Sequence, residues 1–486
     1  KSAYSCGDLE NAQQLSELVL RECCCIEDKL HIYFLLVMIL NSRGEGMNAY
    51  TTCEEVLSQL GETIPQSMGS EQANRMIEST SKMTQNISES VLSEMDEIME
   101  EKLCTLMKFY ILMANVAFFA KPEIFPFLVC RMVQMTIKHG VCKHSLEAFV
   151  ELAALLCGKN TPSDIKDASR LGKAAISCLM RRFNSPEEQS KVYSTYYGFV
   201  AFHIEPLQSC ANMLRIGFDA GMSSGESGTA FLNSIQHIKT ALFSGENLPT
   251  LLDRVDYYLE LAGLHKHVLA KTHLLMFRDT ISTLIDKGES TSSKVFLNKT
   301  VAESANDSAI SQFHRAIQAF WIGHSERCHH NAGKVLEMSS VTGRLGDAVI
   351  MFFYGLNSFH VLKRQNIAKY RKIPTNAITA LKYASSNSRW NFRNKVHLLE
   401  AENFSFCGEN DNAKASYAAA ITSAGCSRFI HEQGLAYECA GIHHKKIGDH
   451  SSAFRFFSRA KHCYQEWGSQ VKVASMTRLL KGFQQI

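Results

Sequence analysis

Proline is scarce in this sequence. Only 8 of the 486 residues are proline, against a usual share of about 5%. Proline is the commonest helix breaker, and no stretch alternates strictly between apolar and polar residues with Asn-Gly turns at its ends, as a β-hairpin would. The composition therefore predicts an all-α chain and excludes collagen, a disordered tail and a disulfide scaffold.

An excess of charge of one sign is also lacking. The 51 Lys and Arg residues against 48 Asp and Glu give a formal net charge of +3, too close to neutral for a protein that binds nucleic acid by electrostatics. The longest apolar runs, residues 32–40 and 110–120, are shorter than the roughly 18–20 residues that span a bilayer. We therefore expect neither nucleic-acid binding nor membrane insertion.

Cysteine is too rare for a secreted disulfide framework. The 16 cysteines are well below the share of about 8–10% that such proteins have. Several, such as Cys130, Cys157 and Cys178, stand inside apolar runs, where a free thiol behaves as a small hydrophobic group. We therefore predict a reducing compartment and a cytoplasmic location. Because the chain begins at Lys1 inside a repeat-like pattern, we interpret it as a segment of a longer polypeptide.

An internal repeat near the C-terminus is the clearest pattern that is present. A glycine is followed by a small residue, an aromatic residue and another small residue at offsets of +5, +4 and +3. The two copies, 40 residues apart, are Gly408, Ala413, Tyr417 and Ala420, then Gly448, Ala453, Phe457 and Ala460. Glycine can take a positive φ in a turn, and the later residues share one face of the next helix. Small residues there let two antiparallel helices approach closely, with the aromatic ring between them.

Helical hairpins repeated in this way build a solenoid. A weaker copy of the pattern is Gly323, Cys328, Ala332 and Val335. We therefore predict a right-handed α-solenoid of antiparallel, tetratricopeptide-like helical hairpins. The predicted segments are N-terminal hairpin repeats (1–60), a polar acidic loop with one surface helix (61–102), central helical repeats (103–287), a polar linker (288–308) and C-terminal repeats with a capping helix (309–486).

Several longer stretches resemble a known protein family. They are 127–133 (FLVCRMV), 155–158 (LLCG), 242–246 (LFSGE), 400–402 (EAE) and 464–468 (YQEWG). Together they are similar to the helical-repeat region of large multidomain signalling ATPases. In that family an AAA-like, STAND-type ATPase module, often behind a protein-kinase-like domain, precedes the repeats, and GAF, histidine-kinase or cyclase domains often follow. The resemblance implies an intracellular signalling arm, and it carries over no catalytic residue, because the catalytic motifs of the family lie in the flanking domains.

Motifs that carry chemistry are missing from the sequence. Residues 172–173 and 333–334, both Gly-Lys, are the nearest approach to a phosphate-binding loop, and each lacks the first glycine and the metal-binding hydroxyl. Adjacent histidines, such as His443 and His444, diverge by about 100° on a helix and cannot converge on one ion. We predict no catalytic residue, no cofactor and no metal ligand in this chain.

Two groups of aromatic residues are candidates for binding. Trp467 either stacks on a ligand or, as we favour, closes the core of a terminal hairpin. A dense aromatic patch is formed by Tyr193, Tyr196, Tyr197 and Phe199. Its spacing favours helix packing, and a groove for a partner peptide is the alternative.

The leading hypothesis is a non-catalytic interaction and regulatory module. It would couple an upstream AAA/STAND-type ATPase to a downstream kinase or cyclase, through protein partners or flanking domains of the same polypeptide. One alternative is a small-molecule-sensing helical domain of a signalling or transcriptional regulator, and another is an enzyme with an unfamiliar all-α site. The sequence does not indicate the oligomeric state. A substantial β-sheet, or buried charged side chains gathered round a cavity, would contradict the leading hypothesis.

Overall fold

The computed structural model of the chain describes residues 8–23, 25–159, 161–286, 308–338, 345–365 and 368–483. Over these ranges it consists of 23 α-helices and a few short 3₁₀ and π turns. The only β-type pairing in this part of the chain is an isolated bridge between Glu97 and Val141. The prediction of an all-α chain is thereby confirmed. The predicted polar linker, 288–308, lies outside the described residues apart from Ser308.

The chain divides into two compact units, neither of which is continuous in sequence. The first comprises Lys1–Tyr196, Ile216–Asn233 and Ala262–His267, and the second comprises Tyr197–Arg215, Ser234–Leu261 and Val268–Ile486. Three helices contribute residues to both units: α12 (Leu207–Ser224), α13 (Ser227–Ser244) and α14 (Leu248–Leu264). These boundaries differ from the five segments predicted from the sequence, because they follow contacts between helices and not changes in composition.

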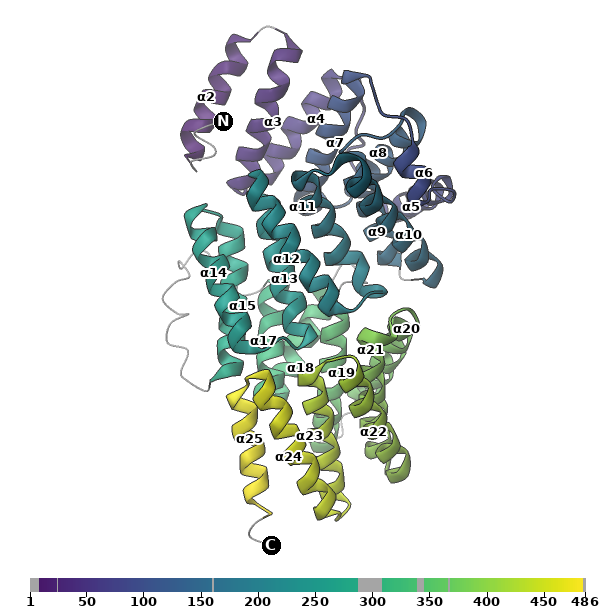
Figure 1. Ribbon diagram of the computed structural model, residues 1–486, viewed down its shortest axis with the longest axis vertical. Helices are drawn as coiled ribbons and strands as arrows, with labels where there is room; N and C mark the ends of the chain where they lie inside the picture. Colours follow the sequence, from purple (N-terminus) through teal and green to yellow (C-terminus); the bar gives the residue numbers. More distant parts are fainter. Residues whose placement is uncertain are drawn as a thin grey trace. The chain divides into compact units, whose positions relative to one another are not determined.

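In the first unit, helices that follow one another in the sequence pack against one another. They are α2 (Leu9–Glu22), α3 (Ile26–Ser42), α4 (Gly46–Gln59), α5 (Ser70–Met83), α6 (Glu89–Glu94), α7 (Glu101–Ala120), α8 (Phe125–His139), α9 (Ser145–Lys159), α10 (Pro162–Cys178) and α11 (Pro186–Thr195), coloured from purple to teal in Figure 1. The order is interrupted twice, because α4 packs directly against α7 and α11 packs against α9. The segment between α4 and α7 therefore lies outside the stack of consecutive helices, and α5 and α6 pack instead on α8, α9 and α10.

The segment 61–102 holds two helices where the sequence analysis expected a loop with one surface helix. Helix α5 buries only Ile77 and Thr80, so its apolar face is too narrow to stand out in a polar sequence. The segment is fixed instead by a side chain from far along the chain. Arg170 of α10 donates hydrogen bonds to the carbonyl oxygens of Thr84, at 2.8 Å, and Ile87, at 2.5 Å.

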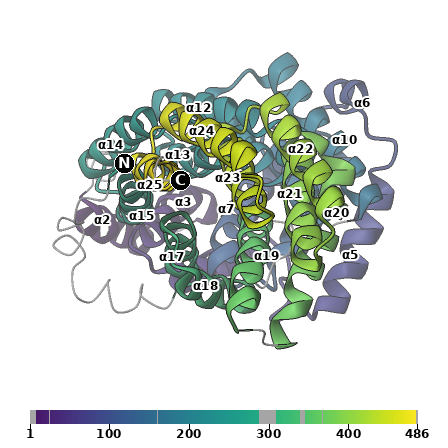
Figure 2. The same ribbon diagram turned by 90° about the horizontal axis from the view of Figure 1, so that it is seen from below.

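In the second unit, consecutive helices from α15 onward also pack in pairs. They are α15 (Val268–Ile285), α17 (Ala309–Ile322), α18 (Ser325–Met338), α19 (Leu345–Gln365), α20 (Lys372–Asn387), α21 (Arg389–Cys407), α22 (Asn410–Cys426), α23 (Ile430–Lys446), α24 (His450–Trp467) and α25 (Gln470–Lys481). Figure 2 shows α20 to α24 as a row of neighbouring helices. Turns of only a few residues join most of them, so neighbouring helices run back along one another.

Candidate functional site

The residues that define the internal repeat lie at equivalent places in two hairpins of the second unit. Gly408 and Gly448 have φ values of 83° and 84° and stand in the turns before α22 and α24. A Cβ at either position would meet no atom within 4 Å, so the turn needs glycine for its backbone angle and not for space. The later members of the pattern, each at most 1% exposed, are Ala413, Tyr417, Ala420, Ala453, Phe457 and Ala460.

Trp467 lies in the core of the second unit, at the end of α24. Its side chain is fully buried, and its ring centroid is 4.8 Å from that of Trp321 and 5.3 Å from that of His431. Burial, together with the nearby charge of Lys395, lowers the pKa of His431 to about 3, so the imidazole is neutral at physiological pH. A ring enclosed in this way could stack on a ligand only by displacing its neighbours.

The aromatic patch is spread over α11 and the π turn Tyr196–Val200. Tyr193, Tyr196 and Tyr197 are buried, and Phe199 is half-buried. The ring of Tyr196 lies so close to α10 that a Cβ added at Gly172 would collide with it. These side chains therefore make contacts typical of helix packing. A peptide groove at this place would require the rings to become exposed, and it stays a prediction.

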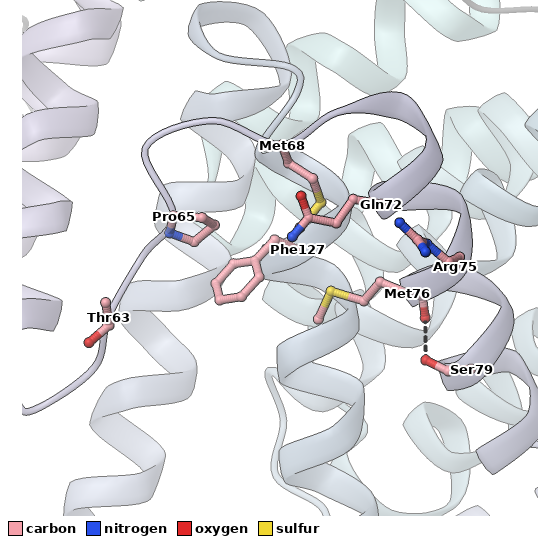
Figure 3. Close-up of a pocket in the computed structure, with 8 residues that line it drawn as sticks. All are labelled: Thr63, Pro65, Met68, Gln72, Arg75, Met76, Ser79 and Phe127. Carbon is pink, nitrogen blue, oxygen red and sulfur yellow. Dashed lines mark hydrogen bonds between the residues drawn. The ribbon is translucent and has the colours of Figure 1, made fainter.

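The first unit contains a pocket of about 630 Å³ beside α5. Its lining comes from the loop after α4 (Thr63, Pro65 and Met68), from α5 (Gln72, Arg75, Met76 and Ser79) and from α8 (Phe127). Figure 3 shows the ring of Phe127 between Pro65 and Met76, with the side chain of Arg75 on the α5 side. Apolar groups thus form the middle of the pocket and polar groups surround them, which is the usual composition of a binding pocket.

Glu62 fixes the loop that forms one wall of this pocket. Its carboxylate accepts a hydrogen bond from Tyr110 Oη at 2.7 Å and another from Arg131 at 3.2 Å, so the loop is tied to α7 and α8. Two apolar residues of the loop, Ile64 and Met68, are buried. The pocket is therefore largely preformed, which reduces the entropy that a partner would lose on binding.

Buried charged side chains form a second notable group in the first unit. Glu147 and Glu151 are one turn apart on α9, each 4% exposed, and Glu188 of α11 is 0% exposed. Lys191 Nζ lies 3.6 Å from a carboxylate oxygen of Glu188, and His144 Nδ1 lies 3.9 Å from the same oxygen. Both oxygens of Glu188 lack a hydrogen-bond donor among the described residues, and so does one oxygen each of Glu147 and Glu151.

Burial controls the protonation of this group. It raises the pKa of Glu147, and together with the charge of Glu147 it raises the pKa of Glu151 well above the usual value. Burial raises the pKa of Glu188 to about 7, although Lys191 acts in the opposite direction. For His144, burial and the positive charges of Lys191 and Lys143 lower the pKa to about 3. The cluster is therefore partly neutral near physiological pH.

This cluster was not predicted from the sequence, and its presence bears directly on the alternative of an all-α enzyme. A carboxyl group whose pKa is close to 7 is suited to general acid–base chemistry. However, Glu147, Glu151 and Glu188 do not line the pocket beside α5, and a catalytic acid must reach its substrate. Among the described residues, no three His, Cys, Asp or Glu side chains are placed to hold a metal ion.

Two of the described helices are long and apolar enough to cross a membrane, judged by length and composition alone. They are Glu101–Ala120 and Leu345–Leu362, with 50% and 67% of the apolar stretch buried inside the protein. The longest apolar runs in the sequence, 32–40 and 110–120, are shorter than these stretches because Lys108 interrupts the apolar residues of the first helix. Partial burial of this kind is typical of a core helix. The absence of membrane insertion stays a prediction.

Comparison of the chain with protein-family models and with curated proteins gives no match. The similarity to signalling ATPases therefore rests on the sequence stretches described above.

Proposed function

We propose that the chain is a non-catalytic helical-repeat module that acts through protein–protein contacts. In this proposal it is a right-handed, tetratricopeptide-like α-solenoid of a multidomain intracellular signalling protein, and it couples an upstream AAA/STAND-type ATPase to a downstream kinase or cyclase domain. The supporting observation is that, within each unit, helices consecutive in the sequence pack in pairs. Arrays built in this way offer extended surfaces to partners.

The pocket beside α5 is the surface that we assign to the partner. An apolar side chain of a partner peptide fits between Phe127, Pro65 and Met76, and the flexible thioethers of Met68 and Met76 can adapt to its shape. The exposed Arg75 at the edge, whose guanidinium lies 3.8 Å from the exposed carboxylate of Glu71, is placed to contact a polar group of the peptide. A buried apolar anchor surrounded by polar contacts is the usual energetic core of such an interface.

The coupling part of the proposal is tested in the full-length protein. Met76→Glu places a carboxylate among the apolar groups of the pocket and should reduce the dependence of the output activity on the ATPase, with the basal rate of each domain unchanged. Met83→Glu is the matched control, because Met83 ends the same helix, is 48% exposed and does not line the pocket. Equal effects of the two variants, or no effect of Met76→Glu, would reject the pocket as the partner site.

The non-catalytic part has its own test. The purified chain should hydrolyse ATP and GTP no faster than a mock preparation carried through the same purification. Activity that survives further purification and that Glu188→Gln abolishes would overturn the proposal in favour of the enzyme alternative.

A small-molecule sensor is the second candidate, and the size of the pocket favours it. About 630 Å³ is within the range of roughly 300–1,000 Å³ that is usual for small-molecule sites. A true ligand stabilises the folded state by mass action, so a thermal-shift screen against metabolites distinguishes a small-molecule sensor from a protein-interaction module. A compound that raises the melting temperature of the wild type, but not that of Met76→Glu, would support the sensor.

A further inference from the structure

A second pocket, of about 340 Å³, lies between α20 and α21 in the second unit. Its polar lining residues are Lys382, Ser385, Arg389, Arg393, His397 and Glu400. The first two belong to α20 and the other four to α21. The pocket thus carries three permanently cationic side chains and a single carboxylate.

Two arginines and a histidine of α21 share one face of the helix. Arg389, Arg393 and His397 follow one another at intervals of four residues, so they lie above one another on successive turns. Arg393 Nε donates a hydrogen bond to His397 Nε2 at 3.2 Å, which links these two side chains.

Glu400 neutralises only one of these cations. Its Oε1 atom lies 2.8 Å from Lys382 Nζ, and its Oε2 atom lies 3.6 Å from His397 Nδ1. Among the described residues, no carboxylate lies within ion-pair distance of Arg389 or Arg393, both of which are exposed. Two guanidinium groups therefore face one small pocket without an acidic partner.

We propose that this pocket binds a phosphate monoester. A guanidinium donates two parallel hydrogen bonds to phosphate oxygens, and a monoester carries close to two negative charges at neutral pH, which matches the two arginines that have no acidic partner. The Ser385 hydroxyl adds a neutral donor, and Arg389 is the first residue of α21, where the helix dipole favours an anion. The volume, at the small end of the range for ligand pockets, suits a phosphate group and the atoms next to it.

The phosphate could be carried by a protein side chain or by a small metabolite, and the two sources share this chemistry. The experiment titrates the full chain, by calorimetry, with a short peptide that carries one phosphoserine and separately with glucose 6-phosphate. The unphosphorylated peptide and glucose are the controls. At least one phosphorylated probe should bind, and whichever binds more tightly identifies the source.

Variants of the pocket test whether the binding is specific. Arg389→Ala and Arg393→Ala should each weaken binding about tenfold, since each removes charge-assisted hydrogen bonds. Glu400→Gln should strengthen binding several-fold, because it removes the only carboxylate of the pocket and frees Lys382. The matched control is Arg455→Ala on α24, where Arg455 is exposed and donates a hydrogen bond to Ser452, and its binding should equal that of the wild type.

Two results would overturn the proposal. One is the absence of binding by both phosphorylated probes to a wild-type chain that is shown by circular dichroism to be folded. The other is binding that Arg455→Ala weakens as much as Arg389→Ala and Arg393→Ala do, since this would indicate a diffuse effect of net charge. The proposal does not depend on the partner site beside α5, so either can fail alone.

Discussion

Glu188 is the best position at which to test how the buried charges affect stability. Its side chain is 0% exposed, and no described group donates a hydrogen bond to either carboxylate oxygen. Burial raises its pKa from 4.5 to about 7. The folded protein therefore binds more protons at this position than the unfolded chain does between these two pH values.

The sign and size of the effect follow from this difference. Glu188 leaves the stability unaffected below pH 4.5 and lowers it progressively as the pH rises through 7. A pKa difference of about 2.5, at about 1.4 kcal/mol for each unit, amounts to about 3.5 kcal/mol. Gln at this position cannot ionise. We therefore expect Glu188→Gln to match the wild type near pH 4.5 and to be more stable by about 3.5 kcal/mol above pH 8.

The assay is urea unfolding, followed by far-ultraviolet circular dichroism at several pH values. His144 changes the stability in the opposite direction, because its pKa is lowered to about 3, and this contribution cancels when variant and wild type are compared at the same pH. Glu71→Gln is the control, since the side chain of Glu71 is 85% exposed, and it should follow the wild type. A difference between Glu188→Gln and the wild type that does not change with pH would refute the reasoning. So would a less stable variant at high pH, because it would mean that Lys191 holds Glu188 ionised.

Three further perturbations test other buried groups. Lys395→Met should lower the free energy of unfolding by about 3–5 kcal/mol, because it leaves the buried Glu432, 4% exposed and 2.8 Å away, without its cation. The double variant Lys395→Met/Glu432→Leu should recover most of this loss in urea unfolding. A double variant as unstable as Lys395→Met would contradict the argument. Gly441→Ala would place a Cβ 2.7 Å from the ring of Phe457, so thermal unfolding should show a free energy of unfolding lower by about 1–3 kcal/mol. An unchanged melting curve would mean that α23 and α24 can move apart. Burial lowers the pKa of His314 from 6.5 to about 3, so the free energy of unfolding should fall as the pH falls below 6.5. His314→Gln should make the urea midpoint less sensitive to acid. A variant whose midpoint is as sensitive to acid as that of the wild type would argue against a neutral His314.

The fold class could be predicted because it depends on local signals. Low proline content and the turn glycines, such as Gly408 and Gly448, act within a few residues of their own position. Only one surface helix was predicted within 61–102, without its bounds, because the stability of α5 comes from elsewhere: its buried face is Ile77 and Thr80 alone, and Arg170 of α10 caps the chain that follows it. Such tertiary support leaves no periodicity in the local sequence.

The burial of some of these carboxylates could be predicted from the sequence, and that of others could not. Glu147 and Glu151 could have been found, because residues 145–157 are apolar on every side, and a helix of that kind is buried all round. Glu188 could not. It stands next to Glu187 in the first turn of a helix that begins at Pro186, where acidic residues are normal on an exposed surface. Its burial is decided by packing partners distant in sequence.

The pocket beside α5 was beyond sequence reasoning for a similar reason. Phe127 is separated from the rest of its lining, 63–79, by the whole of α6 and α7. None of these residues belongs to a recognisable motif, and their only common property is where the chain places them. The aromatic patch at Tyr193–Phe199, by contrast, was conspicuous in sequence, and those rings are largely inside the protein.

A variant of a buried carboxylate can also distinguish a structural role from a functional one. A residue that lowers the stability of its own fold is a common mark of a functional site, where activity and stability compete. If Glu188 is only a packing residue, Glu188→Gln should stabilise the protein and leave unchanged the coupling that we propose between an ATPase and an output domain of the full-length protein. If its ionisation regulates the module, the same variant should be more stable and yet insensitive to pH in that coupling assay. A gain in stability with normal, pH-dependent coupling would exclude the regulatory role, and the partner site beside α5 would remain as the proposed functional feature of the first unit.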